Sequence, residues 1–247
     1  MKYALVTDLH GNRESVSAVV AHARAQGARR WALLGDFVGY GADPDWVVDL
    51  VQELLAEGGL AVLGNHDAAV VSGPSPAMIP DARRVVEWTR ARLSTQQLRF
   101  LAELPLLVVE GDCLFVHANA HAPGQWGYVD SRHAAVQSLQ ATDRRYTFVG
   151  HMHNPMLFHL SSTGKAGDFV PVPGVEIALS PQRQWLVVPG SAGQPRDGNP
   201  AACYALFETD TGTLTYHRVP YDHQTAGAKI QAAGLPQRLA ARLQDGD

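Results

Sequence analysis

Five short apolar runs in this chain end in side chains that bind metal ions, and this pattern restricts the possible folds more than any other feature. The runs are residues 3–6, followed by Asp8 and His10; 31–34, followed by Asp36; 60–63, followed by Asn65; 113–116, followed by His117; and 146–149, followed by His151 and His153. Short apolar runs that end at glycine or polar residues are typical of buried strands. Open α/β sheets place their sites at the carboxyl ends of strands. We therefore expect strand ends that bring these ligands together.

Two of these strand ends carry compact ligand segments, Gly64-Asn65-His66-Asp67 and Gly150-His151-Met152-His153. On an extended chain, residues two apart point to the same side. His151 and His153 should therefore face one site, and so should Asp8 and His10.

Each piece taken alone has a plainer interpretation. Asp8 and His10 would be a loop-exposed pair, Asp36 ordinary turn chemistry, and His117 a core histidine. However, a pair of divalent ions about 3.5 to 4 Å apart needs several anionic or imidazole ligands from different segments, with a carboxylate that bridges. The chain supplies this inventory, and the combination favours a two-metal site.

The first 64 residues alternate strand, helix, strand, helix, strand, which predicts parallel strands with crossover helices. Asn12 can cap the first helix, and Asp43-Pro44 can begin the second. From residue 106 the chain becomes strand-rich, and we expect a second sheet that faces the first. The predicted strands are residues 106–109, 113–117, 146–149, 156–160, 175–179, 185–188, 202–208 and 213–219, with a helix near 131–140 capped by Asp130.

Two helical segments lie outside this alternation. A loop at 73–80 and helices at 81–92 and 95–103 form an insert, about 73–103, which we expect beside the site. A helix, turn and helix occupy about 223–243, either over a sheet edge or against a second subunit. We expect residues 1–247 to form a single domain, and leave monomer or homo-oligomer open.

Composition excludes several classes of protein. The net charge is −4, with 17 Arg and 3 Lys, and no long basic stripe that would suit an extended nucleic-acid surface. No apolar stretch approaches the length of a membrane span, and the apolar segment before Asp8 is too short for a signal-peptide core. Cys113 and Cys203 lie in apolar runs and suggest buried thiols. We expect a cytoplasmic protein with no membrane partner.

The ordered set of ligands resembles that of the calcineurin-like metallophosphoesterase superfamily. The resemblance implies an α/β fold of the four-layer α/β/β/α type, with two mixed sheets flanked by helices. It implies that one metal is bound by Asp8, His10 and His153, the other by Asn65, His117 and His151, and that Asp36 bridges both. Mixed His, Asp and Asn ligands suit Mn, Fe, Zn, Co or Ni better than an all-oxygen Mg site. We expect two divalent ions, Mn or Fe first, with Ni, Zn, Co and Mg as alternatives.

The resemblance also implies a hydrolytic mechanism. Two metals lower the pKa of a bridging water, so that hydroxide can attack phosphorus in line near neutral pH. His66 has no ligand role in the family, where it faces the leaving oxygen as a proton donor or charge stabiliser. Asp67 would orient the ring of His66 through its other nitrogen.

Two longer segments resemble a prokaryotic subgroup of small metallophosphoesterases related to the YfcE-like phosphodiesterases, namely residues 35–44 and 190–200. In the second segment, Arg196 can grip a phosphate with its guanidinium fork, or form a salt bridge with a loop carboxylate. Asn12 and Arg13 are further candidates for substrate contact. His121 can either contact substrate or bond to backbone.

The sequence departs from the protein phosphatases of the superfamily. Residues 38–41 stand where those enzymes carry Asp-Arg-Gly, Asp67 replaces a glutamate, and Ala118 follows His117 where glycine is usual. The first two departures favour a phosphodiesterase that hydrolyses a small phosphodiester, whereas Ala118 departs from the superfamily as a whole and bears only on the backbone at His117. The alternatives are a phosphomonoesterase, a protein phosphatase, a nucleotide pyrophosphatase, a nuclease, or a non-catalytic scaffold, which would have no need of His66.

Overall fold

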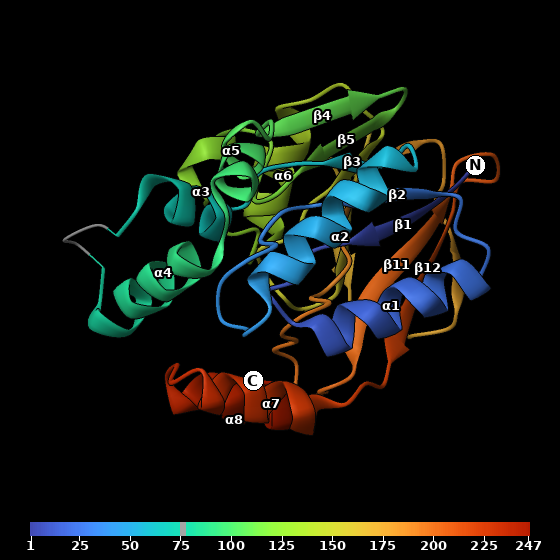
Figure 1. Cartoon of the computed structure of the whole chain (residues 1–247). Helices are drawn as coiled ribbons and strands as arrows, with labels where there is room; N and C mark the ends of the chain where they lie inside the picture. The colour runs from blue at the N-terminus through green and yellow to red at the C-terminus, as the bar shows by residue number, and fades with distance from the viewer. Residues whose placement is uncertain (75–77) are drawn as a thin grey trace.

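The computed structural model describes residues 1–74 and 78–247, and contains two six-stranded mixed sheets (Figure 1). In chain order the strands are β1 (Lys2–Val6), β2 (Arg30–Leu33), β3 (Leu60–Ala61), β4 (Leu107–Glu110), β5 (Cys113–Val116), β6 (Tyr146–Phe148), β7 (Met156–Ser161), β8 (Ala166–Phe169), β9 (Glu176–Ala178), β10 (Arg183–Val188), β11 (Ala202–Glu208) and β12 (Thr213–Val219). The helices are α1 (Arg13–Ala25), α2 (Pro44–Ala56), α3 (Asn65–Ser72), α4 (Pro80–Arg92), α5 (Thr95–Ala102), α6 (Arg132–Gln140), α7 (His223–Ala232) and α8 (Gln237–Asp245), with a 3-10 turn, η1 (Pro123–Gln125).

Each sheet contains three parallel strands whose carboxyl ends point the same way. The first sheet has the order β3-β2-β1-β11-β12-β9, and β1, β2 and β3 are parallel. The second has the order β4-β5-β6-β10-β7-β8, and β5, β6 and β10 are parallel. The other neighbours are antiparallel, including the hairpins β4–β5 and β11–β12.

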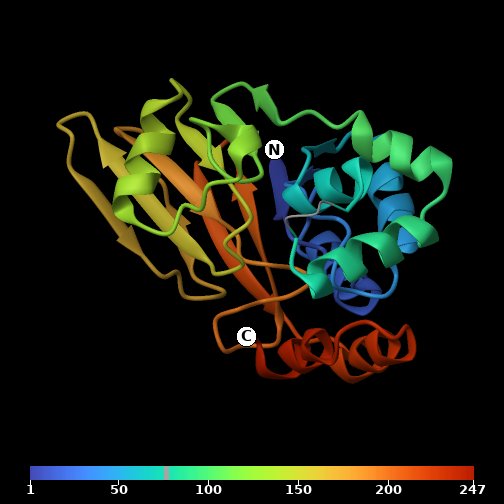
Figure 2. The ribbon, with the colours of Figure 1, turned by 90° about the vertical axis from the view of Figure 1, so that its left-hand side faces the viewer.

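The two sheets pack face to face over an apolar core. Leu5 and Phe207 of the first sheet are buried with Phe115, Phe148 and Trp185 of the second. α1 and α2 cover the outer face of the first sheet, and α6 covers that of the second. Figure 2 shows these layers edge on, with α6 at the left and α1 and α2 at the right. The predicted four-layer α/β/β/α arrangement is therefore confirmed.

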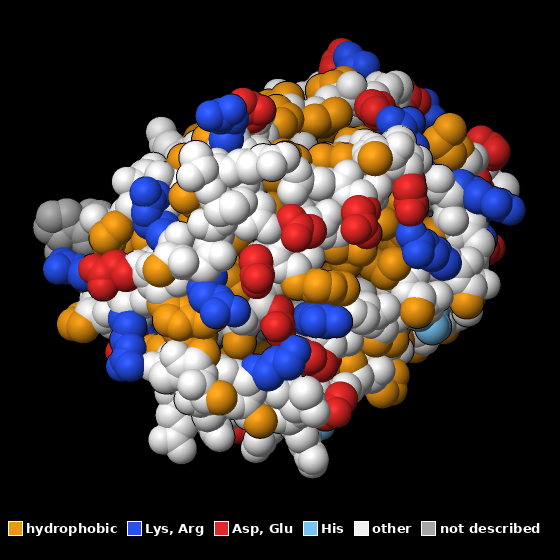
Figure 3. Space-filling model, viewed as in Figure 1, with side chains coloured by type: hydrophobic (Ala, Val, Ile, Leu, Met, Phe, Trp, Pro, Cys, Tyr) orange, Lys and Arg blue, Asp and Glu red, His pale blue; other side chains and the backbone are white. Residues whose placement is uncertain are grey.

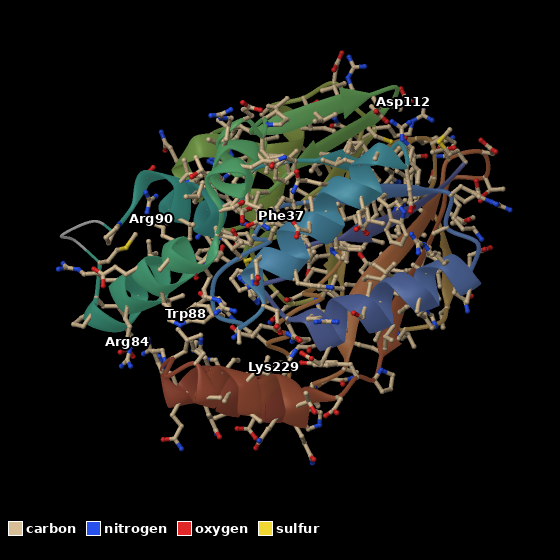
Figure 4. All side chains as sticks on the ribbon, in the orientation of Figure 1. Phe37, Arg84, Trp88, Arg90, Asp112 and Lys229 are labelled. Carbon is tan, nitrogen blue, oxygen red and sulfur yellow. The ribbon has the colours of Figure 1, made fainter. Side chains whose placement is uncertain are left out.

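The C-terminal helices close one side of the molecule. Val85 of α4 is buried together with Ile230 of α7 and Leu243 of α8. Lys229 of α7 forms ion pairs with Glu14 at 2.5 Å and Asp43 at 2.9 Å, near the starts of α1 and α2. Trp88 of α4 lies toward these helices (Figure 4). α7 and α8 thus join the insert to the first layer of helices.

No helix in the described residues is long and apolar enough to cross a membrane.

Several predicted elements differ from those in the structure. Helices α4 and α5 match their predictions, but α3 was not predicted, and β3 has two residues because Leu63 bonds to Pro105 O instead of the ladder. β8 was also missed, because its residues lack apolar alternation and pair only at an edge. Residues 75–77 of the predicted loop 73–80 lie outside the described residues.

Two of the three predicted helix caps are wrong in detail. Asn12 does cap α1, since its Oδ1 accepts from Ser15 N at 3.2 Å. Asp43 precedes α2 without capping it, because its carboxylate pairs with Lys229. α6 is capped by Ser131 rather than Asp130.

Candidate active site

The seven predicted metal ligands meet where the two sheets bring their parallel strand ends together. Asp8 and His10 follow β1, Asp36 follows β2, and the histidines at 117, 151 and 153 follow β5 and β6. Backbone hydrogen bonds join these loops, with Asp8 N donating to Gly35 O at 3.0 Å and Gly150 N to His117 O at 2.7 Å. Asn65 is different, because it lies in the first turn of α3.

The ligand atoms form three overlapping groups, in each of which they lie within 4.8 Å of one another. The groups are Asp8, His10 and His153; His10, Asp36 and His66; and Asp36, His117 and His151. Asn65 joins the third group, since its Oδ1 lies 3.0 Å from His117 Nε2. Asp36 belongs to two groups, and this is the placement that a bridging carboxylate requires.

Backbone carbonyls fix the orientation of four of these imidazole rings. Nδ1 of His10 lies 3.2 Å from Val38 O, Nδ1 of His117 2.7 Å from Leu34 O, and Nδ1 of His153 2.6 Å from Gln194 O. For His151 it is Nε2 that lies 3.0 Å from Trp126 O. A carbonyl only accepts, so each of these nitrogens donates and the other ring nitrogen faces the site. Metal-binding histidines are held in this way.

The electrostatics of the cluster favour a bound cation. Burial lowers the pKa of His10, and burial and His117 lower the pKa of His151 to about 4, so both rings are neutral ligands at neutral pH. Burial would lower the pKa of His117, but Asp36 raises it to about 9. Burial likewise opposes ionisation of Asp36, but His117 keeps the pKa of this carboxyl well below its usual range. The raised pKa of His117 therefore shows that this part of the site attracts positive charge.

The start of α3 packs directly on the carboxylate of Asp36, the predicted bridging ligand. His66 N donates to Asp36 Oδ1 at 2.8 Å, so the first turn of the helix stabilises the negative charge. Gly64 lies so close that a Cβ there would clash with Asp36 N and Oδ1. A glycine is therefore required before the ligand Asn65.

Backbone strain is concentrated in this site. The non-glycine residues with positive φ in the described part of the chain are Asp8, His10, Asp36, Tyr40, Trp126, His151 and His153, with φ between 49° and 68°. Such residues are uncommon and cluster at functional sites. Five of them are predicted metal ligands, so the fold holds the ligands in conformations that their backbone disfavours.

Asp67 does not have the role that we predicted for it. Its Oδ1 accepts from Phe37 N at 2.9 Å and Val38 N at 3.2 Å, and its Oδ2 from Gly64 N at 3.1 Å. Burial and Asp36 raise the pKa of Asp67 to about 7, which the Gly64 amide opposes. Asp67 thus ties α3 to the loop after β2. In the described residues no hydrogen bond joins it to the His66 ring, so it does not orient that ring.

His66 lies against the ligands and against Tyr40. Its ring centroid is 5.0 Å from that of His10 and 4.5 Å from that of Tyr40. Burial lowers the pKa of His66, so that the ring is neutral near pH 7. Because His66 also belongs to a metal-sized group with His10 and Asp36, ligation and catalysis must be separated by experiment.

Two aromatic side chains line the rim of the site, and neither was predicted from the sequence. Tyr40 packs on His10, with ring centroids 4.5 Å apart, and Tyr128 stacks on His151 at 4.1 Å with an interplanar angle of 9°. Tyr128 is 54% exposed. Tyr40 stands in segment 38–41, which lacks the arginine of the protein phosphatases. This departure was the only sequence signal for Tyr40.

Three of the four predicted substrate contacts are not supported. Asn12 is buried and fully engaged, because its Nδ2 donates to Gly193 O at 2.7 Å and to Tyr221 OH at 3.2 Å. Arg13 is exposed, and its guanidinium lies 5.1 Å from the Trp46 ring. His121 is exposed, and no side-chain hydrogen bond is found for it within the described chain. Only Arg196 lies beside the site, 5.6 Å from the Tyr40 ring.

This donor set fits divalent metal ions. It supplies two ionised carboxylates, an amide oxygen and four imidazoles whose second nitrogens are already bonded to carbonyls. Neutral imidazole, carboxylate and carbonyl oxygen together are ligands of first-row transition metals.

Comparison with known proteins agrees with this geometry. A family model, the calcineurin-like phosphoesterase superfamily domain, matches residues 1–212. An uncharacterized protein of Methanocaldococcus jannaschii is 33% identical over 245 residues, covering 97% of this chain and 96% of the relative. The crystal structure of a metallophosphoesterase from Sphaerobacter thermophilus is 34% identical and has a TM-score of 0.88, with 100% of both chains covered. A hypothetical protein from Pyrococcus horikoshii, 16% identical, shares the fold at a TM-score of 0.79, covering 100% of this chain and 98% of that one. The chain is therefore a metal-dependent hydrolase of phosphoric esters and belongs to the calcineurin-like phosphoesterase superfamily.

Proposed function

We propose that this protein is a phosphodiesterase that uses two divalent metal ions to hydrolyse a small phosphodiester. The observation that carries the proposal is the position of Asp36 between the two sets of ligands. Asp36 groups with His117 and His151 on one side, and on the other with His10, which also belongs to the group of Asp8 and His153. Asp8, His10 and His153 would hold one ion, and Asn65, His117 and His151 the other. Ions bound there lower the pKa of a coordinated water and offset negative charge on the phosphoryl oxygens.

The protein side chains then have two tasks. Asp36 and the helix α3 behind it keep the two ligand groups together, since His66 N holds one carboxylate oxygen and leaves the other, Oδ2, 3.4 Å from His117 Nε2. The His66 ring donates to the leaving oxygen. A neutral imidazole retains one N–H, so the lowered pKa of His66 does not prevent this role.

The preference for a diester rests on residues 38–41. This segment passes beside the site without a cation, and places Tyr40 there instead. A dianionic monoester would gain more than a monoanionic diester from an arginine at this point. A phosphomonoesterase is the second candidate, and Arg196 favours it.

We propose Mn or Fe as the native metals, since four imidazoles in the site suit these ions better than Mg. We propose that the substrate is small, since the net charge is −4 and the face in Figure 3 shows Lys and Arg interspersed with Asp and Glu. We also propose a cytoplasmic location, which the two buried free thiols, Cys113 and Cys203, support.

The test is a comparison of aryl esters with the purified protein. Bis-p-nitrophenyl phosphate and p-nitrophenyl phosphate are each assayed with Mn, Ni and Mg after chelation, and kcat/KM is measured for each pair. We expect Mn to support the highest rates and the diester to exceed the monoester. A higher kcat/KM for the monoester would identify a phosphomonoesterase. Inactivity with both esters and every metal would favour the scaffold.

A further inference from the structure

Arg196 is a partly buried cation with no carboxylate partner among the described residues. Its neighbour Asp197 pairs with Arg218 instead, and Arg218 also donates to Ala201 O at 3.0 Å. Arg196 donates a hydrogen bond to Gln194 Oε1 at 3.1 Å. It also interacts with the Tyr40 hydroxyl, since burial raises the pKa of Tyr40 and Arg196 opposes that rise. Among the described residues, Arg196 therefore does not form the structural salt bridge that was the alternative for this loop.

Two buried donors at this point lack an acceptor. Nε of Arg196 is buried without a hydrogen-bond partner, and so is Nε2 of Gln194, whose side chain is only 1% exposed. Leaving buried N–H groups unsatisfied is costly, and more so for a charged group. Guanidinium and amide N–H groups can only donate. The missing partner is therefore an acceptor, and the charge of Arg196 favours an anionic one.

These donors lie next to the metal ligands. Gln194 O accepts from Nδ1 of His153, which fixes the loop after β10 to one ligand. The Arg196 guanidinium lies 5.6 Å from the centroid of Tyr40, whose ring is 4.5 Å from those of His10 and His66. The donors of Arg196 and Gln194 thus lie beside Tyr40, whose ring packs against His66.

We propose that Arg196 and Gln194 form an oxyanion subsite that binds a phosphate oxygen of the substrate. The inference rests on the proposed phosphoesterase function. A guanidinium fork is well matched to two phosphate oxygens, and the amide of Gln194 supplies a third donor.

The first measurement is phosphate binding, which needs no turnover. Inorganic phosphate is titrated calorimetrically into the Mn-loaded protein and into Arg196→Gln, Arg196→Lys and Arg218→Gln. We expect Arg196→Gln to weaken binding by roughly 10- to 100-fold, because it removes charge-assisted hydrogen bonds. Arg196→Lys keeps the charge without the fork and should be intermediate. Arg218→Gln is the matched control, because Arg218 lies in β12 and pairs with Asp197 of the same loop; it should lower the melting temperature without weakening phosphate binding.

The second measurement identifies which phosphate is bound. KM is compared for bis-p-nitrophenyl phosphate and for a nucleoside diphosphate ester. A rise in KM for both in Arg196→Gln places the contact on the reacting phosphoryl group, whereas a rise only for the second places it on a phosphate of the leaving group.

Unchanged phosphate affinity in both Arg196 variants of an active, metal-loaded enzyme would overturn the subsite. Absence of turnover in the wild type would instead count against the proposed function, so the two failures are distinguishable.

Discussion

Charged side chains are paired at one end of the sandwich but lack some of their partners at the other. At the amino ends of the parallel strands, an open cavity of about 690 Å³ is lined by Arg30, Glu110, Asp112 and Arg145 among others. Each charged group that lines it has a partner of opposite sign, such as Arg30 and Glu110, whose charged atoms lie 2.6 Å apart. At the carboxyl ends, buried carboxylates face imidazoles, and Arg196 has no anionic partner within residues 1–74 and 78–247.

The difference shows why this cavity is not the better candidate for chemistry. In Figure 4, Asp112 marks the hairpin at the end where the charged groups are paired. This hairpin lies away from Phe37, which follows the predicted ligand Asp36. Charges that are already paired gain little from a ligand. The metal-binding end keeps polar groups whose partners must come from outside, and burial makes that requirement strong.

Asp36→Asn should have the largest effect. Removing the shared carboxylate should lower turnover by about 10³-fold or more and abolish binding of at least one metal. Saturating Mn should raise the melting temperature of the wild type by roughly 5–10 °C at ~100 times Kd, and that of Asp36→Asn by much less. Metal content by mass spectrometry and thermal melts measure both. Asp112→Asn, at the other end, is the control, and an equal loss there would contradict the comparison.

His66→Ala should lower turnover by roughly 10²- to 10⁴-fold while two metals remain bound. The physical reason is loss of the N–H that stabilises the leaving oxygen. Metal stoichiometry and kcat are measured on the same sample. If one metal is lost, His66 is a ligand, as its group with His10 and Asp36 allows. Wild-type turnover in the variant would remove His66 from the mechanism.

Glu110→Gln should have the smallest effect. Glu110 accepts from Tyr3 OH at 2.8 Å and pairs with Arg30. Tyr3 is buried, but the side chains of Arg30 and Glu110 are 29% and 30% exposed, so water can replace much of the ion pair. We expect a loss of about 1 kcal/mol in the free energy of unfolding, measured by urea denaturation, with kcat/KM and metal affinity unchanged. A change in kcat/KM or in metal affinity would show that the two ends are coupled.

The sequence was most informative where one local rule decides the outcome. Apolar runs ending in ligands predicted the positions of Asp8, Asp36 and His117, because strand direction carries a ligand to the sheet edge. Helix α3 was missed since Asn65 and His66 resemble a strand end in sequence, while their role depends on the first turn of a helix packed on Asp36.

The contacts that failed or were missed depend on tertiary partners. Asn12 is polar and near Asp8 in sequence, but Gly193 and Tyr221 satisfy its amide. Asp67 bonds to the amides of Phe37 and Val38, which lie thirty residues earlier. Gln194 has no signal of its own, because only the folded loop places its amide beside Arg196. No periodicity in the sequence encodes such pairings.

The left-handed backbone of the ligand loops has a consequence for how this protein can change over time. Each such non-glycine residue costs on the order of 1 kcal/mol or more, and the surrounding fold tolerates all seven. Replacing His10 or His151 with glycine would relieve that cost while discarding a ligand. In a duplicated copy released from selection for hydrolysis, the relief of this strain would therefore offset part of the stability that is lost with the metals.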